Sequence, residues 1–97
     1  MTCLVILEIK LKKDLIEEFR AWERKILPDT RGFPGCASLS VVQNQDEPTS
    51  IAVLTQWDSR KQFESYFNWR NESGVFPELM QMLDGAPSLR YFDYFGV

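Results

Sequence analysis

The 97-residue chain contains no histidine. Histidine is the usual general base near neutral pH, the base of serine–histidine catalysis and a common ligand of haem and zinc. Its absence excludes those catalytic arrangements, histidine-ligated haem and most zinc sites. The two cysteines, Cys3 and Cys36, are too few for a zinc site built of thiolates alone, and no glycine-rich phosphate loop is present. We therefore expect neither a metal nor an organic cofactor.

Basic runs and long apolar runs are also missing. The net charge of −3, without a basic cluster, argues against binding to nucleic acid or to an anionic membrane surface. No apolar run approaches the roughly 18 residues of a membrane span, and the first residues lack the pattern of a signal peptide. We expect a cytoplasmic protein whose two thiols are small hydrophobic side chains rather than a disulfide.

Apolar residues make up 44% of the chain and charged residues 26%, which is typical of a globular protein. The length suits one domain that spans residues 1–97. Apolar residues alternate with polar ones, or run continuously, in four segments bounded by turn residues, a pattern that predicts strands. These segments are 3–11, 36–43, 51–57 and 88–95.

A first amphipathic helix is predicted between Asp14 and Leu27. Asp14, followed by Glu17, resembles a capping box, and Pro28 predicts the helix end. Its apolar stripe contains Leu15, Ile16, Phe19, Trp22, Ile26 and Leu27. The residues predicted to face water are Glu17, Glu18, Arg20, Glu23 and Arg24.

A second long helix is predicted to open at Ser59, which forms a capping box with Gln62. The segment 71–74 interrupts it. Pro77 suits the first turn of a short further helix, which the segment 85–87 ends.

The predicted order is therefore β-α-β-β-α-β with a short extra helix before the last strand, an α+β, ferredoxin-like sandwich. Its antiparallel sheet carries helices on one face only, so the other face of a monomer should be polar. Here that face is predicted to carry Leu4, Ile6, Ala52, Leu54, Phe92 and Tyr94. We expect a homodimer in which two such faces pack together as a dimeric α+β barrel.

Aromatic residues concentrate in the segment 51–69. Trp57 ends the third strand, and the helix that follows carries Phe63, Tyr66, Phe67 and Trp69. Phe63, Tyr66 and Phe67 share one helix face with Arg70. This corner builds either a thick core or a pocket, and the two alternatives imply different functions.

The chain resembles the antibiotic-biosynthesis monooxygenase family of dimeric α+β barrels over nearly its whole length. The resemblance rests on FPGC at 33–36, IAVLTQW at 51–57, DSRKQFESY at 58–66 and APSLRYFDYF at 86–95. It implies a small dimer. Some members oxidise aromatic phenols or quinols with dioxygen and without metal or flavin, other branches degrade haem, and others have no assigned activity.

Single positions extend or limit the resemblance. Trp57 matches the strand-ending tryptophan that lines the cavity in monooxygenase-like members. Nine residues later, where the family often has histidine, this chain has Tyr66. The haem-degrading branch also needs an asparagine in the first strand, and CLVILEIKL contains none. Both departures argue against haem degradation.

Two functions stay open at this level. The first is a cofactor-independent monooxygenase for a small aromatic phenol or quinol; the second is a non-catalytic dimer that binds a small ligand or serves as a scaffold. For the first, Tyr66 would donate or relay a proton and Arg70 would stabilise a developing oxyanion. The candidate substrate-binding residues are Trp57, Phe63, Asn68 and Trp69.

Overall fold

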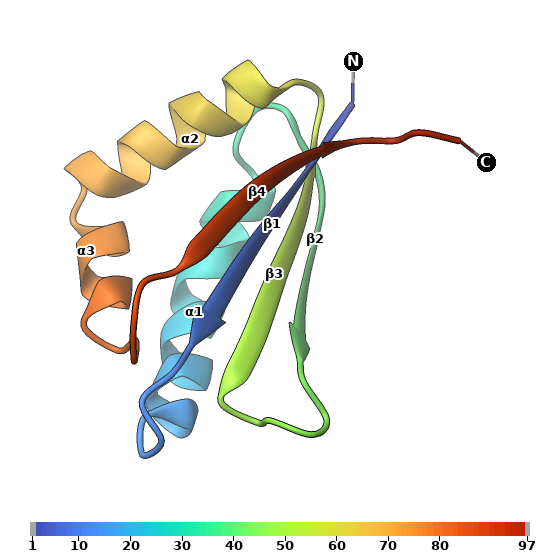
Figure 1. The fold of residues 1–97 in the computed structure, drawn as a ribbon. Helices are drawn as coiled ribbons and strands as arrows, with labels where there is room; N and C mark the ends of the chain where they lie inside the picture. Colours follow the sequence, from blue (N-terminus) through green and yellow to red (C-terminus); the bar gives the residue numbers. More distant parts are fainter. Residues whose placement is uncertain (1, 97) are drawn as a thin grey trace.

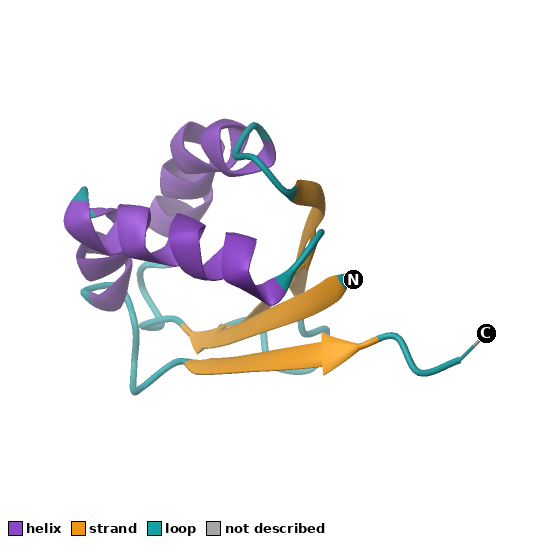
Figure 2. Ribbon diagram, turned by 90° about the horizontal axis from the view of Figure 1, so that it is seen from above, coloured by secondary structure: helices purple, strands orange, loops and turns teal. Residues whose placement is uncertain are grey.

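The computed structural model describes residues 2–96 and has an α+β, ferredoxin-like fold. Along the chain the elements are β1 (Cys3–Lys10), α1 (Ile16–Arg31), β2 (Cys36–Gln43), β3 (Ser50–Trp57), α2 (Arg60–Glu72), α3 (Val75–Met80) and β4 (Ser88–Asp93). The four strands form one antiparallel sheet in the order β2-β3-β1-β4. All three helices lie on the same face of this sheet (Figures 1 and 2). The element order and the fold class predicted from the sequence are confirmed.

The alternation in the central strands sets which side chains face the helices. Val5 of β1 pairs with Thr55 of β3, and Ile9 pairs with Ile51; all four side chains are buried. Because successive strand residues point to opposite faces, their neighbours Leu4, Ile6 and Leu54 belong to the helix-free face.

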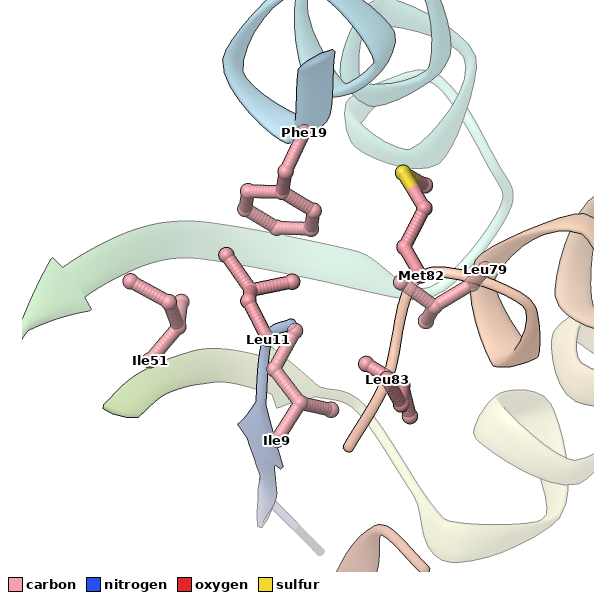
Figure 3. Packing of buried hydrophobic residues seen from close by; sticks show 7 residues of the cluster. All are labelled: Ile9, Leu11, Phe19, Ile51, Leu79, Met82 and Leu83. Atoms are coloured by element: carbon pink, nitrogen blue, oxygen red, sulfur yellow. The ribbon is translucent and has the colours of Figure 1, made fainter. Parts of the chain in front are cut away.

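The core on the helix side has two parts. One cluster gathers around Phe19 of α1 and consists of Ile9, Leu11, Phe19, Ile51, Leu79, Met82 and Leu83 (Figure 3). A second cluster consists of Cys3, Val5, Trp57 and Phe63. The two clusters occupy different ends of the same layer between helices and sheet.

Both predicted ends of α1 were wrong. The turn at 12–15 is closed by a backbone bond from Leu15 N to Lys12 O (3.0 Å), so the helix begins at Ile16 and Asp14 does not cap it. At the other end the helix continues through Pro28 to Arg31. Proline removes one helical N–H, but Pro28 is exposed, and the continued turn carries Thr30 into the protein interior, where it is buried.

The other two helices begin as predicted, but α3 ends at Met80 and not at the predicted stop of 85–87, because the chain turns there and Leu83 bridges to Leu11. The Ser59 hydroxyl accepts a hydrogen bond from the Gln62 amide (3.3 Å), as an N-cap does. After α2, Gly74 adopts a left-handed conformation (φ 84°), which glycine alone adopts without strain. Pro77 lies in the first turn of α3, two residues after its start.

Two strands are shorter than predicted. β1 ends at Lys10, and Leu11 makes only an isolated bridge to Leu83. β4 ends at Asp93 rather than Phe95, because Asp93 already lies opposite Cys3, the first residue of β1. The chain beyond it extends away from the sheet (Figure 1).

The helix-free face of the sheet carries a band of apolar side chains. Leu54 lies opposite Ile6, Phe92 opposite Leu4, and Val42 opposite Ala52. Val42 and Phe92 are exposed at 48% and 38% of their surfaces. The predicted positions on this face are confirmed except for Tyr94, which lies beyond the last strand. The apolar side chains share the face with Gln56 and with the ion pair of Glu8 and Arg90.

The cysteines are free. Cys3 lies opposite Trp57 on one side of β3, and Cys36 lies opposite Trp57 on the other. Two strand spacings separate them by roughly 10 Å, farther than the roughly 7 Å between Cα atoms that a disulfide spans. Within residues 2–96, no helix is long and apolar enough to cross a membrane, and no three potential metal-ligating acidic, cysteine or histidine side chains gather.

Candidate functional site

A cavity of about 80 Å³ lies between the helices and the sheet. Val5 and Phe63 of one core cluster line it, and so do Ile9, Phe19 and Leu79 of the other. The cavity therefore separates the two halves of the core. Its wall is apolar except at a few positions, which define the chemistry available inside.

Three of the polar side chains form one hydrogen-bonded cluster that joins α1 to α2. Arg70 donates from Nε to the Tyr66 hydroxyl (3.0 Å) and from Nη2 to Thr30 Oγ1 (2.9 Å). The Thr30 and Tyr66 oxygens lie 2.7 Å apart. Nη2 also donates to the backbone carbonyl of Ile26 (2.8 Å). All three side chains line the cavity.

Arg70 is a buried cation, with 4% of its surface exposed. Among residues 2–96 it forms no ion pair with a carboxylate. Neutral groups stabilise its charge instead: the bonded oxygens, the Trp69 ring (4.4 Å from the guanidinium carbon) and the last turns of α1, where the helix dipole is negative. Within the described part of the chain its Nη1 forms no hydrogen bond and is not one of the buried unpaired polar atoms, so it can reach an oxygen outside the cluster.

The hydroxyl protons of this cluster can be arranged in two ways, because either oxygen can donate to the other. Thr30 Oγ1 already accepts from Arg70, and its own buried proton needs an acceptor. Donation from Thr30 to Tyr66 satisfies that proton. In this arrangement the Tyr66 O–H is left to donate toward a ligand in the cavity.

Glu23 is the carboxylate in the cavity wall. Burial raises the pKa of its carboxyl group above the ordinary value of 4.5, while the nearby charges of Arg20, Arg24 and Arg31 act in the opposite direction. No hydrogen bond or ion pair to Glu23 is formed within residues 2–96. The sequence pattern had placed Glu23 on the solvent side of α1, and the structure corrects this.

A signal for Glu23 and Thr30 was present in the sequence. Glu23 follows Phe19 by four residues and precedes Ile26 by three, so it lies on the apolar stripe of the helix. Thr30 continues that stripe, but the predicted helix ended at Pro28 and therefore did not include Thr30.

The predicted site residues divide into two groups. Phe63, Tyr66 and Arg70 line the cavity, whereas Trp57, Asn68 and Trp69 are not among the described residues that form its wall. Asn68 is exposed. It lies two residues from both Tyr66 and Arg70 along the helix, and a separation of two residues places side chains on nearly opposite sides of a helix. Trp69 is 38% exposed and stacks on Phe33 at a centroid distance of 5.5 Å.

Trp57 lies behind the cavity wall. It is fully buried and packs against Phe33, Phe63 and Tyr66 at ring-centroid distances of 6.2, 5.6 and 5.2 Å. Its indole N–H has no acceptor within the described residues. The geometry makes Trp57 a support that fixes the position of the Tyr66 ring.

Comparisons with known proteins agree with this architecture. A family model described as antibiotic biosynthesis monooxygenase matches residues 2–72. The uncharacterized protein sll1783 of Synechocystis sp. is 32% identical over 59 residues. That alignment covers 61% of this chain but only 40% of the relative, so the chain spans about two fifths of that protein.

Solved structures share the fold at low sequence identity. Rv0793 from Mycobacterium tuberculosis has a TM-score of 0.87 at 14% identity, covering 100% of this chain and 98% of that one. SnoaB, described as a cofactor-independent oxygenase from Streptomyces nogalater, has a TM-score of 0.85 at 10% identity, with 99% and 95% covered. Because the family model matches well over half of its residues, this chain belongs to the antibiotic biosynthesis monooxygenase family.

Proposed function

We propose that the protein is a cofactor-independent monooxygenase that oxidises a small aromatic phenol or quinol in the cavity between the helices and the sheet. The observation that carries the proposal is an apolar cavity whose polar wall groups include the Tyr66 hydroxyl and the unpaired Nη1 of Arg70. Membership of the monooxygenase family supports it.

The proposed reaction needs only the substrate and dioxygen. A phenol with a free ring position gives a quinone and water: one oxygen atom enters the ring, the other leaves as water, and the substrate supplies all four electrons. The protein excludes water and stabilises charge on the substrate oxygen. Arg70 and Tyr66 are assigned those contacts, Phe63 packs against the ring, and Trp57 supports Tyr66 from behind.

The size of the cavity limits the substrate. An engineered cavity of about 150 Å³ binds benzene, which is roughly twice the volume of this one, about 80 Å³. A single-ring substrate therefore requires some wall side chains to move when it enters. A polycyclic substrate would require a much larger displacement of the core.

The second candidate function is non-catalytic binding of a small ligand by the same dimer. It is favoured by the polar cluster itself, because Tyr66 and Arg70 already bond to Thr30 and Ile26 within the protein. A pure scaffold role is less well supported, because a scaffold has no use for a cavity inside its core.

We also propose that residues 1–97 form a single domain, which includes the undescribed residues 1 and 97, and that two copies pair through the helix-free sheet face as a dimeric α+β barrel. Burial of one Leu or Phe side chain contributes about 1.5–3 kcal/mol, and Leu54, Ile6 and Phe92 lie within one patch on that face. A cytoplasmic location completes the proposal and is supported by the free thiols.

Oxygen uptake with a panel of single-ring phenols and quinols tests the proposed reaction. We expect turnover by the wild-type protein, and a large loss in Tyr66→Phe and Trp57→Phe. The matched control is Tyr94→Phe, because Tyr94 is 57% exposed beyond the sheet. Tight binding without oxygen uptake would favour the non-catalytic alternative. Turnover that survives both Tyr66→Phe and Trp57→Phe would show that the assigned site is wrong.

A further inference from the structure

A second hollow lies beside the cavity, between α1 and the edge strand β2. This groove has a volume of about 230 Å³ and borders Arg20 and Arg24 on the helix and Gln43 on the strand. Phe19, Glu23 and Val41 line both the cavity and the groove. These three side chains therefore lie at the boundary between the cavity and the groove, which we call the neck.

Glu23 is the one titratable group at this neck. The charged groups around its carboxylate are the guanidinium groups of Arg20, Arg24 and Arg31 on its own helix and, across the cavity on α2, that of Arg70. The facing strand β2 contributes only Val41, Val42 and Gln43 to the groove, none of them charged. Burial raises the pKa of Glu23 above its ordinary value in spite of the arginines.

Oxidation of a phenol begins with loss of its hydroxyl proton, and the chain has no histidine to accept it. Among the groups that line the cavity, Arg70 is permanently protonated, and the Tyr66 oxygen already accepts a hydrogen bond from Arg70. Thr30 accepts from Arg70 as well. Thr55 also lines the cavity and donates to the Val5 carbonyl, but a neutral hydroxyl is a far weaker base than a carboxylate. Among the described lining residues Glu23 supplies the carboxylate acceptor, and no bond within residues 2–96 occupies it.

We propose that Glu23 is the general base of the cavity: its carboxylate takes the hydroxyl proton of a phenol or quinol that enters through the neck. This assignment rests on the proposed function. The carboxylate becomes a neutral carboxylic acid, and the electron pair of the broken O–H bond stays on the substrate as a phenolate. Dioxygen is the oxidant of the steps that follow.

The position of Glu23 relative to Arg70 is consistent with one group accepting the proton and the other stabilising the negative charge. Arg70 bonds to Ile26 and Thr30, which lie three and seven residues after Glu23 on α1. At about 1.5 Å per residue, the base and the cation are roughly 5–10 Å apart along the helix. At the short end of this range one substrate oxygen can lie within hydrogen-bond distance of both groups, so Glu23 takes its proton and Arg70 stabilises the phenolate oxygen that remains.

A charge-neutral variant at the same position tests the assignment. Oxygen uptake is measured against pH for wild type, Glu23→Gln and the control Glu18→Gln, which changes an exposed glutamate of the same helix. Substrate affinity is measured in parallel by tryptophan fluorescence. For Glu23→Gln we expect a fall in kcat of about 10²–10⁴-fold, the usual contribution of a general base, with affinity retained. The rise of activity with pH that wild type shows as Glu23 loses its proton should disappear.

Other results overturn the assignment in distinguishable ways. If Glu23→Gln keeps the kcat and the pH profile of Glu18→Gln, Glu23 is not the base, while the proposed function stands. If wild type itself turns over no phenol or quinol, the proposed function fails and the base assignment fails with it. Should Glu23→Gln fold poorly, Glu23→Asp replaces it: a base role predicts reduced kcat with the pH-dependent rise preserved, and an unchanged kcat contradicts it.

Discussion

Arg70→Lys is the substitution that most directly tests how the buried cluster is held together. It keeps the positive charge but replaces the planar guanidinium with a shorter ammonium group. In the native protein, Nε bonds to Tyr66, while Nη2 bonds to Thr30 and Ile26. A single ammonium nitrogen on a shorter side chain cannot occupy both positions, so one or two bonds are lost while the charge stays buried.

The magnitude follows from those bonds. A hydrogen bond to a charged group contributes about 1.5–3 kcal/mol, so at about 2 kcal/mol each the loss of one or two predicts destabilisation by about 2–4 kcal/mol. In a domain of this size, 1 kcal/mol lowers the melting temperature by about 4–8 °C. The expected decrease is therefore roughly 8–32 °C.

Arg70→Met provides a comparison in which the less conservative substitution is expected to be the more stable one. Methionine removes the buried charge together with its bonds, and the Thr30 and Tyr66 hydroxyls, 2.7 Å apart, still bond to each other. Because a buried charge with too few partners costs more than no charge at all, we expect Arg70→Met to be more stable than Arg70→Lys.

Urea denaturation at one fixed protein concentration measures the stability of all variants, because the stability of the proposed dimer would depend on concentration. The control is Arg60→Lys, which alters an exposed arginine of the same helix that pairs with Glu64, and it should change stability far less. The reasoning is refuted if Arg70→Lys is as stable as wild type, or if it is more stable than Arg70→Met.

Two further predictions concern the sheet face and the neck of the cavity. Leu54→Arg places a charge in the apolar patch and should convert the proposed dimer to a monomer, as measured by light scattering at micromolar concentration. Ser65→Arg on α2 should leave the assembly unchanged, and a wild-type monomer would contradict the proposed interface. Burial raises the pKa of Glu23 in the folded protein. Its contribution to stability is complete below the pKa that Glu23 has in the unfolded chain and is lost as pH rises through the pKa that it has in the folded protein. The urea midpoint of Glu23→Gln should therefore rise relative to that of wild type as pH increases from acidic to neutral. A difference between the two midpoints that does not change with pH would contradict this.

Local patterns predicted the parts of the site that lie on one helix. Phe63, Tyr66 and Arg70 follow helical spacing after the Ser59 cap, and all three line the cavity. Spacing also explains why Asn68 points elsewhere. These relations depend on about two turns of backbone, so they can be deduced without knowing the rest of the fold.

The other half of the site depends on where α1 ends. Continuation through Pro28 brings Thr30 within 2.7 Å of Tyr66 and 2.9 Å of Arg70. The local preference of proline to end a helix is outweighed here by bonds to residues some forty positions away. Trp57 shows the same limit, because the strand pattern predicts that it is buried but not whether it lines a cavity or lies behind the wall.

The sequence by itself determined the order of elements, the faces of the strands and the apolar side of each helix, because alternation and helical spacing are short-range properties of the backbone. The absence of histidine also restricted the chemistry to reactions that need no imidazole. Only the tertiary structure decided that the two core clusters leave a cavity between them, that Arg70 is buried with no carboxylate partner among residues 2–96, and that Glu23 lies at the neck. Those features arise where side chains from α1, α2 and the sheet meet, and the volume left between them depends on the packing of all three together.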